Sequence, residues 1–194
     1  MNNHFLVVVD MQNDFIDGSL GSEDAQKILP KVVKKIMNHN GPIIATVDTH
    51  DSDYDLTLEG KMLPVPHCIK LSNGWEINKE VASAMILQGN YIGYVEKNTF
   101  GSVELPDVIK NYIDSCKNIG LVFNPIVKVP NNPDPEFTII GLDTDICVIS
   151  NALILRAAFP NSKITIDGHC CAGSSRKAHY AALEIAKSCQ ITIA

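Results

Sequence analysis

The chain has 194 residues, of which 45% are hydrophobic, and a formal net charge of -6. This length and composition are typical of one globular domain with a complete core, so we predict a single domain over residues 1–194. The negative charge excludes the basic surface by which proteins bind nucleic acids. No apolar run approaches the roughly 20 residues that span a bilayer, and the N-terminus lacks a signal-peptide pattern, so we expect a cytoplasmic protein with no membrane partner.

Strand and helix patterns alternate along the chain. In order, they predict a strand at 4–9, a helix at 24–40, a strand at 42–47, a long loop at 51–75, a short helix at 79–87, a strand at 91–96, a helix at 102–115, a loop at 128–136, a strand at 137–142, a helix at 148–158, a strand at 163–166, a helix at 174–188 and a strand at 190–193. Continuous apolar strands separated by amphipathic helices are typical of a parallel sheet covered on both faces. The predicted fold is a doubly wound, Rossmann-like α/β domain with a mostly parallel sheet of about six strands.

Two of the predicted helices show a clear apolar face. The residues expected to be buried are Ile28, Val32, Ile36 and Met37 in the helix at 24–40, and Ala178, Ala182, Ile185 and Ala186 in the helix at 174–188. The helix at 102–115 is expected to begin with Ser102 as its N-cap.

The six cysteines form no CxxC pair and no zinc-finger spacing. They are Cys68, Cys116, Cys147, Cys170, Cys171 and Cys189. We expect all six to be reduced thiols, as is usual for proteins of this size inside cells.

Reactive side chains stand where predicted strands end. Asp10, Asp48 and Lys97 each follow or close an apolar strand, and a polar turn from Asp143 leads to Cys147 at the start of a helical pattern. In a doubly wound sheet, ligands bind beyond the carboxyl ends of the strands, so these groups are expected to meet there. Taken one at a time, Asp10 could instead cap a turn and Lys97 could be a solvated strand end; their joint placement favours a catalytic site.

Cys147 admits two interpretations. At the start of a helix, a thiol gains from the helix dipole and from free backbone N–H groups, which favour the thiolate and can also face a developing oxyanion. The alternative is a buried cysteine that packs as a small hydrophobic residue.

The four groups suggest one chemistry. Cys147 would attack a carbonyl carbon, and the backbone N–H groups of Asp143 and Cys147 would form the oxyanion hole. Asp10 would protonate the leaving amine and then activate water, while Lys97 would hold the anionic groups in place. This set contains no histidine, which separates it from papain-type sites.

A metal site is predicted beside these residues. Asp48 and His50 are two residues apart at a strand end, so their side chains share one face, and the following loop supplies Glu59 and His67. Two histidines and two carboxylates could hold zinc, iron or manganese. The alternative is that Asp48 and His50 only shape the loop. Phe15, just beyond the first strand, could stack on a flat substrate or simply pack in the core.

Three motifs resemble one family over essentially the whole chain. They are Val8 to Phe15 (VVDMQNDF), Glu96-Lys97 with the loop to Ser102, and Gly141 to Val148 (GLDTDICV). These resemble the isochorismatase-like cysteine hydrolases, and most closely the nicotinamidase branch. The resemblance implies a catalytic triad of Asp10, Lys97 and Cys147, and a cis peptide before Asp143 that turns its N–H into the oxyanion hole. It also implies a metal that holds the pyridine nitrogen of the substrate, and a homo-oligomer.

Two departures from the nicotinamidase pattern bear on the substrate. Asp143 stands where a small residue is usual, and a carboxylate there would repel a thiolate, point away, or contact a polar substrate in the pocket. Leu56 stands where many nicotinamidases have a metal-binding histidine, which makes Glu59 the candidate replacement.

The leading hypothesis is therefore a metal-containing cysteine amidohydrolase that converts nicotinamide to nicotinate and ammonia through a thioester. An alternative keeps the triad but acts on another small amide, a carbamoyl compound or a ureido compound. A catalytically silent binding relative is a further alternative, against which the intact triad argues. A thiol redox enzyme is less well supported because Cys147 has no CxxC partner.

Overall fold

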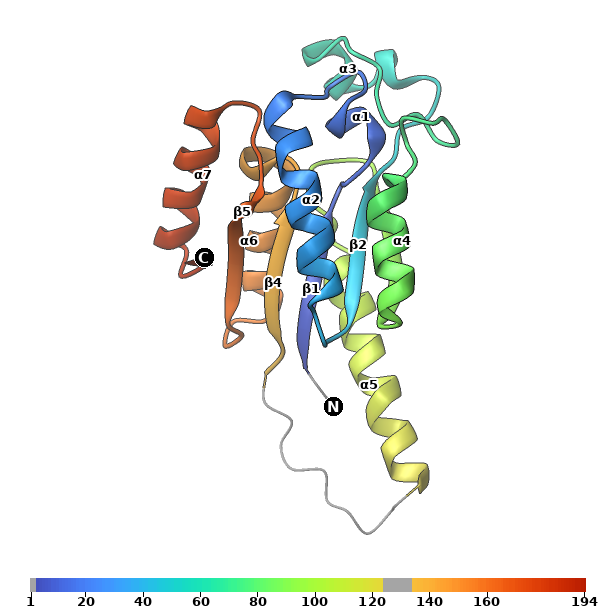
Figure 1. Ribbon diagram of the computed structural model, residues 1–194, viewed down its shortest axis with the longest axis vertical. Helices are drawn as coiled ribbons and strands as arrows, with labels where there is room; N and C mark the ends of the chain where they lie inside the picture. Colours follow the sequence, from blue (N-terminus) through green and yellow to red (C-terminus); the bar gives the residue numbers. More distant parts are fainter. Residues whose placement is uncertain (1–2, 124–133) are drawn as a thin grey trace.

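The computed structural model describes residues 3–123 and 134–194, so most of the loop predicted at 128–136 lies outside the described residues. The described chain forms a parallel six-stranded sheet in the order β3-β2-β1-β4-β5-β6 (Figure 1). The strands are β1 (His4–Val9), β2 (Ile43–Asp48), β3 (Tyr91–Lys97), β4 (Glu136–Gly141), β5 (Ile164–Cys171) and β6 (Thr192–Ile193). The predicted α/β class and the parallel sheet of six strands are confirmed.

Helices cover both faces of this sheet. They are α1 (Asn13–Ile16), α2 (Glu23–Met37), α3 (Leu58–Met62), α4 (Lys79–Gln88), α5 (Leu105–Phe123), α6 (Ile149–Ala158) and α7 (Arg176–Ser188), together with a 3-10 helix, η1 (Tyr54–Leu56), and a π-helix, η2 (Thr144–Val148). Helices α2 and α4 lie on one face, and α5, α6 and α7 lie on the other (Figure 1).

The central strand β1 shows why the apolar runs are continuous. Phe5, Val7 and Val9 belong to the core shared with α5, α6 and α7, whereas Leu6 and Val8 belong to the core shared with α2 and α4. Because both faces of the sheet are covered, every position of the strand must be apolar. Each of these buried side chains contributes on the order of 1.5–3 kcal/mol to folding.

Several details differ from the sequence-based expectations. Met37 and Ile185 are 43% and 55% exposed, so their predicted burial was wrong. Met37 is the last residue of α2, and in α7 the inward face is formed by Ala182, Leu183 and Ala186. Strand β5 extends to Cys171 through polar residues that hide it from a search for apolar runs. The predicted loop at 51–75 contains η1 and α3, the latter capped by Thr57, whose Oγ1 accepts a hydrogen bond from the N–H of Gly60.

Two further expectations concern cysteines and membranes. All six cysteines are free thiols, as predicted. Among the described residues, no helix is long and apolar enough to cross a bilayer.

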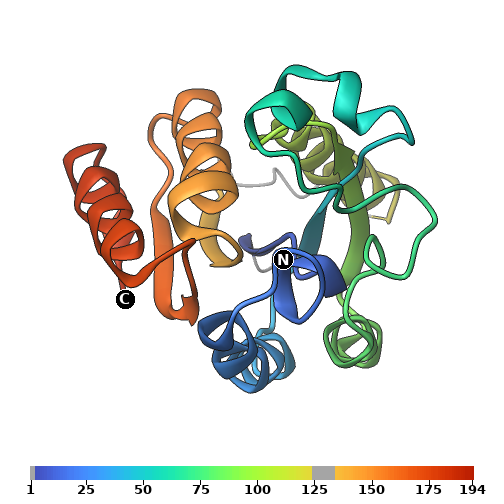
Figure 2. The ribbon, with the colours of Figure 1, turned by 90° about the horizontal axis from the view of Figure 1, so that it is seen from above.

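The carboxyl ends of the strands lie at one end of the molecule. Figure 2 looks onto this end, where α1, the segment that carries α3, and the start of α6 surround the ends of the central strands. The parallel register aligns Val9 with Gly141, and Asp48 with Lys97. Side chains at or just after the carboxyl ends of β1, β2, β3 and β4 therefore project into a common region.

Candidate active site

Asp10, Lys97 and Cys147 meet at this end of the sheet. The Nζ atom of Lys97 lies 2.7 Å from Oδ2 of Asp10 and 3.5 Å from Sγ of Cys147. All three side chains are buried, and Asp10 has no solvent exposure at all. The structure thus brings together the three residues that the sequence placed in a triad, and it does so around a single ammonium group.

The backbone turns sharply at Asp10 to place its carboxylate. Asp10 has φ of 49°, in the left-handed region that non-glycine residues rarely occupy, and such outliers cluster at functional sites. On the neighbouring strand, Gly141 has φ of 123°, and a Cβ atom there would lie 2.0 Å from the carbonyl oxygen of Val9. Only glycine allows β1 and β4 to approach so closely at this point.

Thr46 fixes the orientation of Asp10. Its hydroxyl donates a hydrogen bond of 2.6 Å to Oδ1 of Asp10, which leaves Oδ2 directed to Lys97. Thr46 is fully buried in β2, and the backbone N–H of Asp10 donates to its carbonyl oxygen. No sequence pattern marks this residue, because it looks like any β-branched residue of a buried strand.

Replacing Thr46 with valine is expected to lower kcat about 10- to 100-fold with little change in KM. The substitution keeps the side-chain shape but removes a hydrogen bond to a charged group, worth about 1.5–3 kcal/mol. Because this bond lowers the pKa of Asp10, its loss should also move the acidic limb of the pH–rate profile to higher pH. Steady-state kinetics across pH check both effects. Thr46→Ser should restore most of the rate; equal losses in the two variants would contradict an orienting role for the hydroxyl.

Burial sets the protonation of the triad. Desolvation raises the pKa of Asp10, although Lys97 opposes this shift. Burial alone would lower the pKa of Lys97, but Asp10, Cys147 and Asp48 together raise it, so the ammonium keeps its proton. Desolvation and the carboxylate of Asp10 raise the pKa of the Cys147 thiol despite Lys97. Burial and Asp10 therefore oppose the thiolate that a position near a helix start was expected to favour.

Cys147 lies in a π-helical turn rather than at the head of a regular α-helix. The backbone N–H groups of Ile146 and Val148 both donate to the carbonyl oxygen of Asp143. π-Helical turns are rare and are frequent at functional sites. The Leu142–Asp143 peptide bond that precedes the turn is cis, as the family resemblance implies. The N–H groups of Asp143 and Cys147 remain the predicted oxyanion hole.

The side chain of Asp143 is half-buried beside other carboxylates. Desolvation, Asp145 and Asp10 raise its pKa to about 7. Burial, Asp10 and Asp48 are the main causes of the raised Cys147 pKa and Lys97 opposes them, so the repulsion expected from Asp143 is not among the main causes. Its role as a substrate-pocket residue remains a prediction.

Asp143→Asn is expected to stabilise the protein at neutral and higher pH but not at acid pH. The folded-state pKa of about 7 exceeds the unfolded value of about 3.9, so folding disfavours the charged form. This cost is absent below about pH 4, grows as the pH rises toward 7, and stays constant above. Because the side chain is partly exposed, we expect the substitution to raise the free energy of unfolding by about 1–3 kcal/mol. The melting temperature should rise by roughly 2–4 °C for each kcal/mol. Thermal melts of both proteins from pH 4 to 8 measure this, and a difference that does not grow with pH would contradict it.

Asp48, His50 and His67 form a buried cluster of possible metal ligands. One ligand atom from each lies within 4.8 Å of the others, and Oδ2 of Asp48 lies 3.1 Å and 3.5 Å from Nε2 of His50 and His67. Such separations suit donors that each bind a metal at about 2.0–2.2 Å. Nδ1 of His67 is 2.9 Å from the carbonyl oxygen of Val65, which fixes the ring and leaves Nε2 for a ligand bond. The donor set therefore fits a divalent transition metal.

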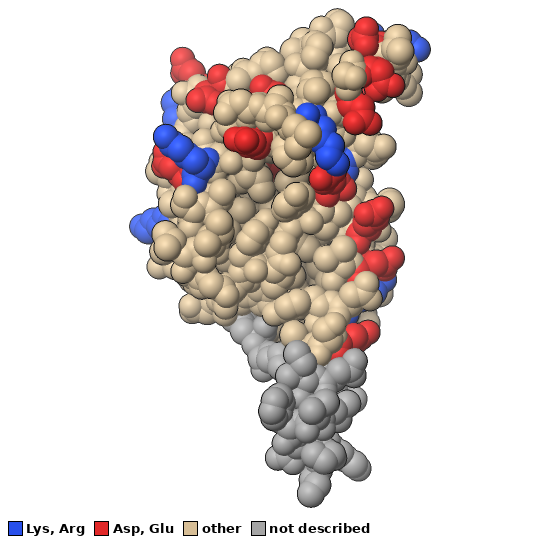
Figure 3. All heavy atoms as spheres, turned by 90° about the vertical axis from the view of Figure 1, so that its right-hand side faces the viewer, with Lys and Arg blue, Asp and Glu red and all other residues tan. Residues whose placement is uncertain are grey.

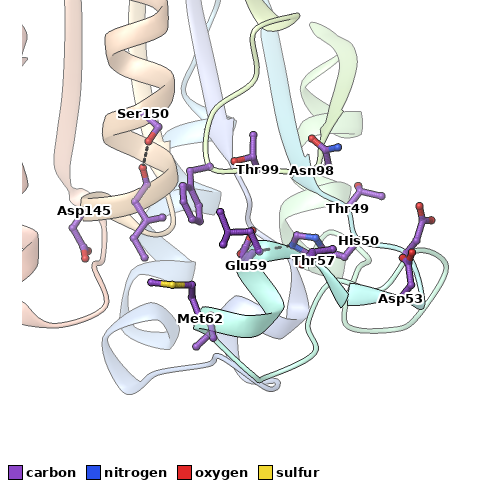
Figure 4. Close-up of a pocket in the computed structure, with 15 residues that line it drawn as sticks. Thr49, His50, Asp53, Thr57, Glu59, Met62, Asn98, Thr99, Asp145 and Ser150 are labelled. Atoms are coloured by element: carbon purple, nitrogen blue, oxygen red, sulfur yellow. Dashed lines mark hydrogen bonds and ion pairs between the residues drawn. The ribbon is translucent and has the colours of Figure 1, made fainter. Parts of the chain in front are cut away.

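Glu59 lies at the edge of this cluster rather than within it. Its Oε1 atom is 3.6 Å from Nε2 of His67 and 3.9 Å from Nε2 of His50 (Figure 4). Leu56 is exposed in η1, so it leaves this side of the cluster to Glu59. The buried cluster contains the other three predicted ligands, Asp48, His50 and His67. Glu59 remains a candidate for the fourth position.

Aromatic rings surround the two histidines. The Tyr54 ring lies 4.8 Å from His50 and 5.0 Å from His67, and its hydroxyl donates to the carbonyl oxygen of Leu63. Phe15 is buried and its ring lies 5.6 Å from that of His67. Both rings restrict the orientation of the metal-binding imidazoles, and Phe15 does so from within the core.

Three polar residues that the sequence did not single out hold the site in place. Gln12 accepts a hydrogen bond from the backbone N–H of Asp48 and donates to its carbonyl oxygen. Asp14 accepts from the N–H of Cys68, the residue after His67. Asn151 in α6 donates to the carbonyl oxygen of Cys147 and accepts from the N–H of Ser102. Gln12 and Asp14 lie within the Asp10 motif, whose polar spacing was the available signal.

Comparison with known proteins places the chain among hydrolases of one fold. The sequence model of the isochorismatase domain matches residues 4–121, and no curated protein sequence matches significantly. Similar solved structures include a nicotinamidase/pyrazinamidase from Bacillus subtilis, with 24% identity, full coverage of both chains and a TM-score of 0.74. The pyrazinamidase of Pyrococcus horikoshii in complex with zinc has 22% identity, covers 99% of this chain and 98% of its own, and has a TM-score of 0.67. N-carbamoylsarcosine amidase from Thermoplasma acidophilum has 22% identity, covers 100% and 95%, and has a TM-score of 0.64.

Proposed function

This chain belongs to the isochorismatase domain family of hydrolases, and on that premise we propose that it is a cysteine amidohydrolase that cleaves a small amide through a thioester, with nicotinamide as the leading substrate. The observation that carries this proposal is the buried contact of Lys97 with both Asp10 and Cys147. A carboxylate, an ammonium and a thiol at this separation can exchange a proton without solvent, as nucleophilic catalysis requires.

The first half of the reaction forms a thioester and releases ammonia. The thiol proton of Cys147 passes to Asp10 as Sγ bonds to the amide carbonyl carbon, and Lys97 stabilises the thiolate that develops. The carbonyl oxygen becomes an oxyanion that the N–H groups of Asp143 and Cys147 are proposed to bind. Asp10 then gives its proton to the leaving nitrogen, the C–N bond breaks, and ammonia departs.

The second half returns the enzyme to its starting state. Asp10 takes a proton from a water molecule, whose oxygen attacks the thioester carbon. The second oxyanion collapses, the C–S bond breaks, and the proton on Asp10 returns to Cys147. The raised pKa of Asp10 suits a group that must hold and release one proton in each half.

The metal cluster is proposed to orient the substrate. Asp48, His50 and His67, with Glu59 nearby, would hold zinc, iron or manganese. When bound there, a divalent metal supplies a Lewis acid that can hold a substrate heteroatom such as a pyridine nitrogen. Lys97 also lies 3.1 Å from Oδ1 of Asp48, so the cluster and the triad share one carboxylate.

Removing the metal is expected to lower kcat/KM at least about 100-fold, because loss of a Lewis acid costs several kcal/mol. Chelation followed by dialysis, metal analysis, and readdition of zinc, manganese or iron measures the loss and identifies the active metal. His67→Ala should behave like the chelated enzyme, whereas His169→Ala, an exposed histidine, serves as the matched control. Full activity in a verified metal-free sample would remove the metal from the mechanism.

The decisive experiment measures ammonia release from nicotinamide by the purified protein, with metal content determined on the same sample. Release that depends on Cys147 would establish the proposed reaction. No release from reduced, metal-loaded protein would exclude nicotinamide and favour another small amide or a carbamoyl or ureido compound. The unusual Asp143 and the similarity to a carbamoylsarcosine amidase favour that second candidate.

The chain is also proposed to form a homo-oligomer. The face that bears α4 and β3 has few charged side chains at its centre (Figure 3). Ile86, Leu87 and Tyr94 are exposed on these elements, and β3 is an edge strand of the sheet. Exposed apolar groups beside an edge strand are typical of subunit contacts. Light scattering of the purified chain measures the number of copies.

A further inference from the structure

A cavity of ≈ 890 Å³ opens beside the triad and the metal cluster (Figure 4). Ligand sites for drug-sized molecules span about 300–1,000 Å³, so a single pyridine ring with its carboxamide would fill only a fraction of this space. The apolar part of its wall, here called the apolar cleft, is made by Leu58, Met62, Leu63, Phe100 and Ile146. These side chains come from α3 and the residue after it, the loop after β3, and η2.

The cavity lies beside the reactive groups, although Asp10, Lys97 and Cys147 are themselves buried and do not line it. His50 and Glu59 of the metal region line it, Asn98 on its wall follows Lys97, and Ile146 precedes Cys147. A substrate whose carbonyl lies at Cys147 therefore has space to extend from the amide toward α3. Figure 4 shows Met62 and Glu59 on the same helix, with Met62 on the side toward Asp145 and Glu59 toward His50.

The side chains of the apolar cleft are unusually exposed. Leu58 is 79% exposed, Met62 80% and Phe100 46%. Apolar groups gathered at the mouth of a reactive site, rather than scattered singly, mark a binding surface. Three of them converge on one cavity here, so an apolar ligand would remove them from water.

Three hydroxyl groups on the wall already have hydrogen-bond partners in the protein. Thr57 Oγ1 donates to the carbonyl oxygen of Tyr54, and Ser150 Oγ donates to that of Ile146. Thr49 Oγ1 donates a hydrogen bond to the carbonyl oxygen of Val47 and accepts one from the indole N–H of Trp75. This leaves Asn98 and Thr99 as the uncharged side chains of the wall that can bind a polar part of the substrate.

The charge of the cavity is negative. Four carboxylate residues stand on the wall, and no lysine or arginine is among the residues described there. The four are Asp51, Asp53, Glu59 and Asp145. A metal at the neighbouring cluster would offset the charge of Glu59, but Asp51, Asp53 and Asp145 have no cationic side chain beside them on the described wall, so they would repel an anionic substituent that lies away from the metal.

We infer that the substrate is an uncharged amide that carries an apolar chain or ring substituent of several carbons, bound in the apolar cleft. This inference rests on the proposed amidohydrolase function and narrows its substrate class. The amide group lies at Cys147, and its apolar substituent contacts Leu58, Met62 and Phe100. Affinity then comes from burial of apolar surface, at about fourfold per fully buried methylene.

The test is a series of primary amides: propanamide, butanamide, hexanamide and octanamide, with nicotinamide and adipamate alongside. In the metal-loaded holoenzyme, kcat/KM should rise about two- to fourfold per added methylene, mainly through KM. Adipamate, which has the same number of carbons as hexanamide but a terminal carboxylate, should react at least about tenfold more slowly than hexanamide. A flat series, or equal rates for these two compounds, would overturn the inference.

One double variant and one control locate the effect. The double variant Leu58→Ser/Met62→Ser should lower the ratio of hexanamide to propanamide kcat/KM at least about fivefold. Ile185→Ser, which changes an exposed apolar residue of α7 that does not line the cavity, should leave that ratio unchanged. The same response in both proteins would overturn the assignment to the apolar cleft.

The outcomes separate this inference from the proposed function. Hydrolysis of nicotinamide with a flat series would uphold the amidohydrolase and overturn the apolar substituent. If no amide reacts, the proposed function fails. Calorimetric binding of the same amides to Cys147→Ala then tests whether the apolar cleft binds an apolar chain. Affinity that rises with chain length would support the cleft as an apolar ligand site, and affinity independent of chain length would overturn it.

Discussion

Cys147→Ala is expected to reduce amide hydrolysis at least about 10⁴-fold while the protein stays folded. Removing the nucleophile eliminates the thioester route, and the remaining groups can only stabilise direct attack by water. Alanine fills most of the buried space of the thiol, so the change in stability should be small. Ammonia release under saturating substrate measures the rate, and thermal melts check the fold.

Asp10→Asn should cause a loss of similar size, because asparagine can neither take the thiol proton nor deliver it to the leaving nitrogen. Residues that act as a unit are not additive, so the double variant should be hardly slower than either single variant. Multiplicative losses would contradict a shared proton-transfer role for the two residues.

Cys171→Ala provides the matched control. Cys171 is also a buried thiol with a raised pKa, but it lies at the end of β5, where its Sγ faces the carbonyl oxygen of Ile139. Its replacement should leave activity within a few-fold of the starting protein. A loss comparable to that of Cys147→Ala would mean that general damage to the core, rather than loss of the nucleophile, explains the result.

The sequence was sufficient to predict that Asp10, Asp48, Lys97 and Cys147 lie close together. Each lies at or after the carboxyl end of a strand, and parallel strands end at the same edge of a sheet, so no knowledge of distances was needed. The metal cluster followed from the same rule, because Asp48 and His50 share a face at the end of β2.

The residues that orient these groups could not be predicted in the same way. Thr46 meets Asp10 only because β1 and β2 pair in one particular register, and Gln12 reaches Asp48 across the same pair of strands. A buried threonine in a strand has no pattern that reveals its partner. Local reasoning also missed the pKa of Cys147, since the helix start is visible in the sequence whereas the depth of burial depends on the whole fold.

Lys97→Met is expected to abolish most activity and also to destabilise the protein by about 3 kcal/mol. The ammonium is the cation that contacts both Asp10 and Asp48, at 2.7 Å and 3.1 Å. Removing one partner of a buried ion pair leaves an uncompensated charge, at a cost of about 3–5 kcal/mol, part of which Asp10 avoids by taking up a proton. A domain of this size should then melt roughly 6–12 °C lower.

The matched control is Lys70→Met, which removes an equally short ion pair at the surface. Lys70 lies 2.6 Å from Glu96, and both side chains are substantially exposed, so the change should cost at most about 1 kcal/mol. Adding Asp10→Asn to Lys97→Met removes the uncompensated charge and should recover part of the lost stability without recovering activity. Thermal melts of the four proteins test this. If Lys97→Met and Lys70→Met melt alike, or if Asp10→Asn adds to the loss, the ammonium of Lys97 does not hold the site together.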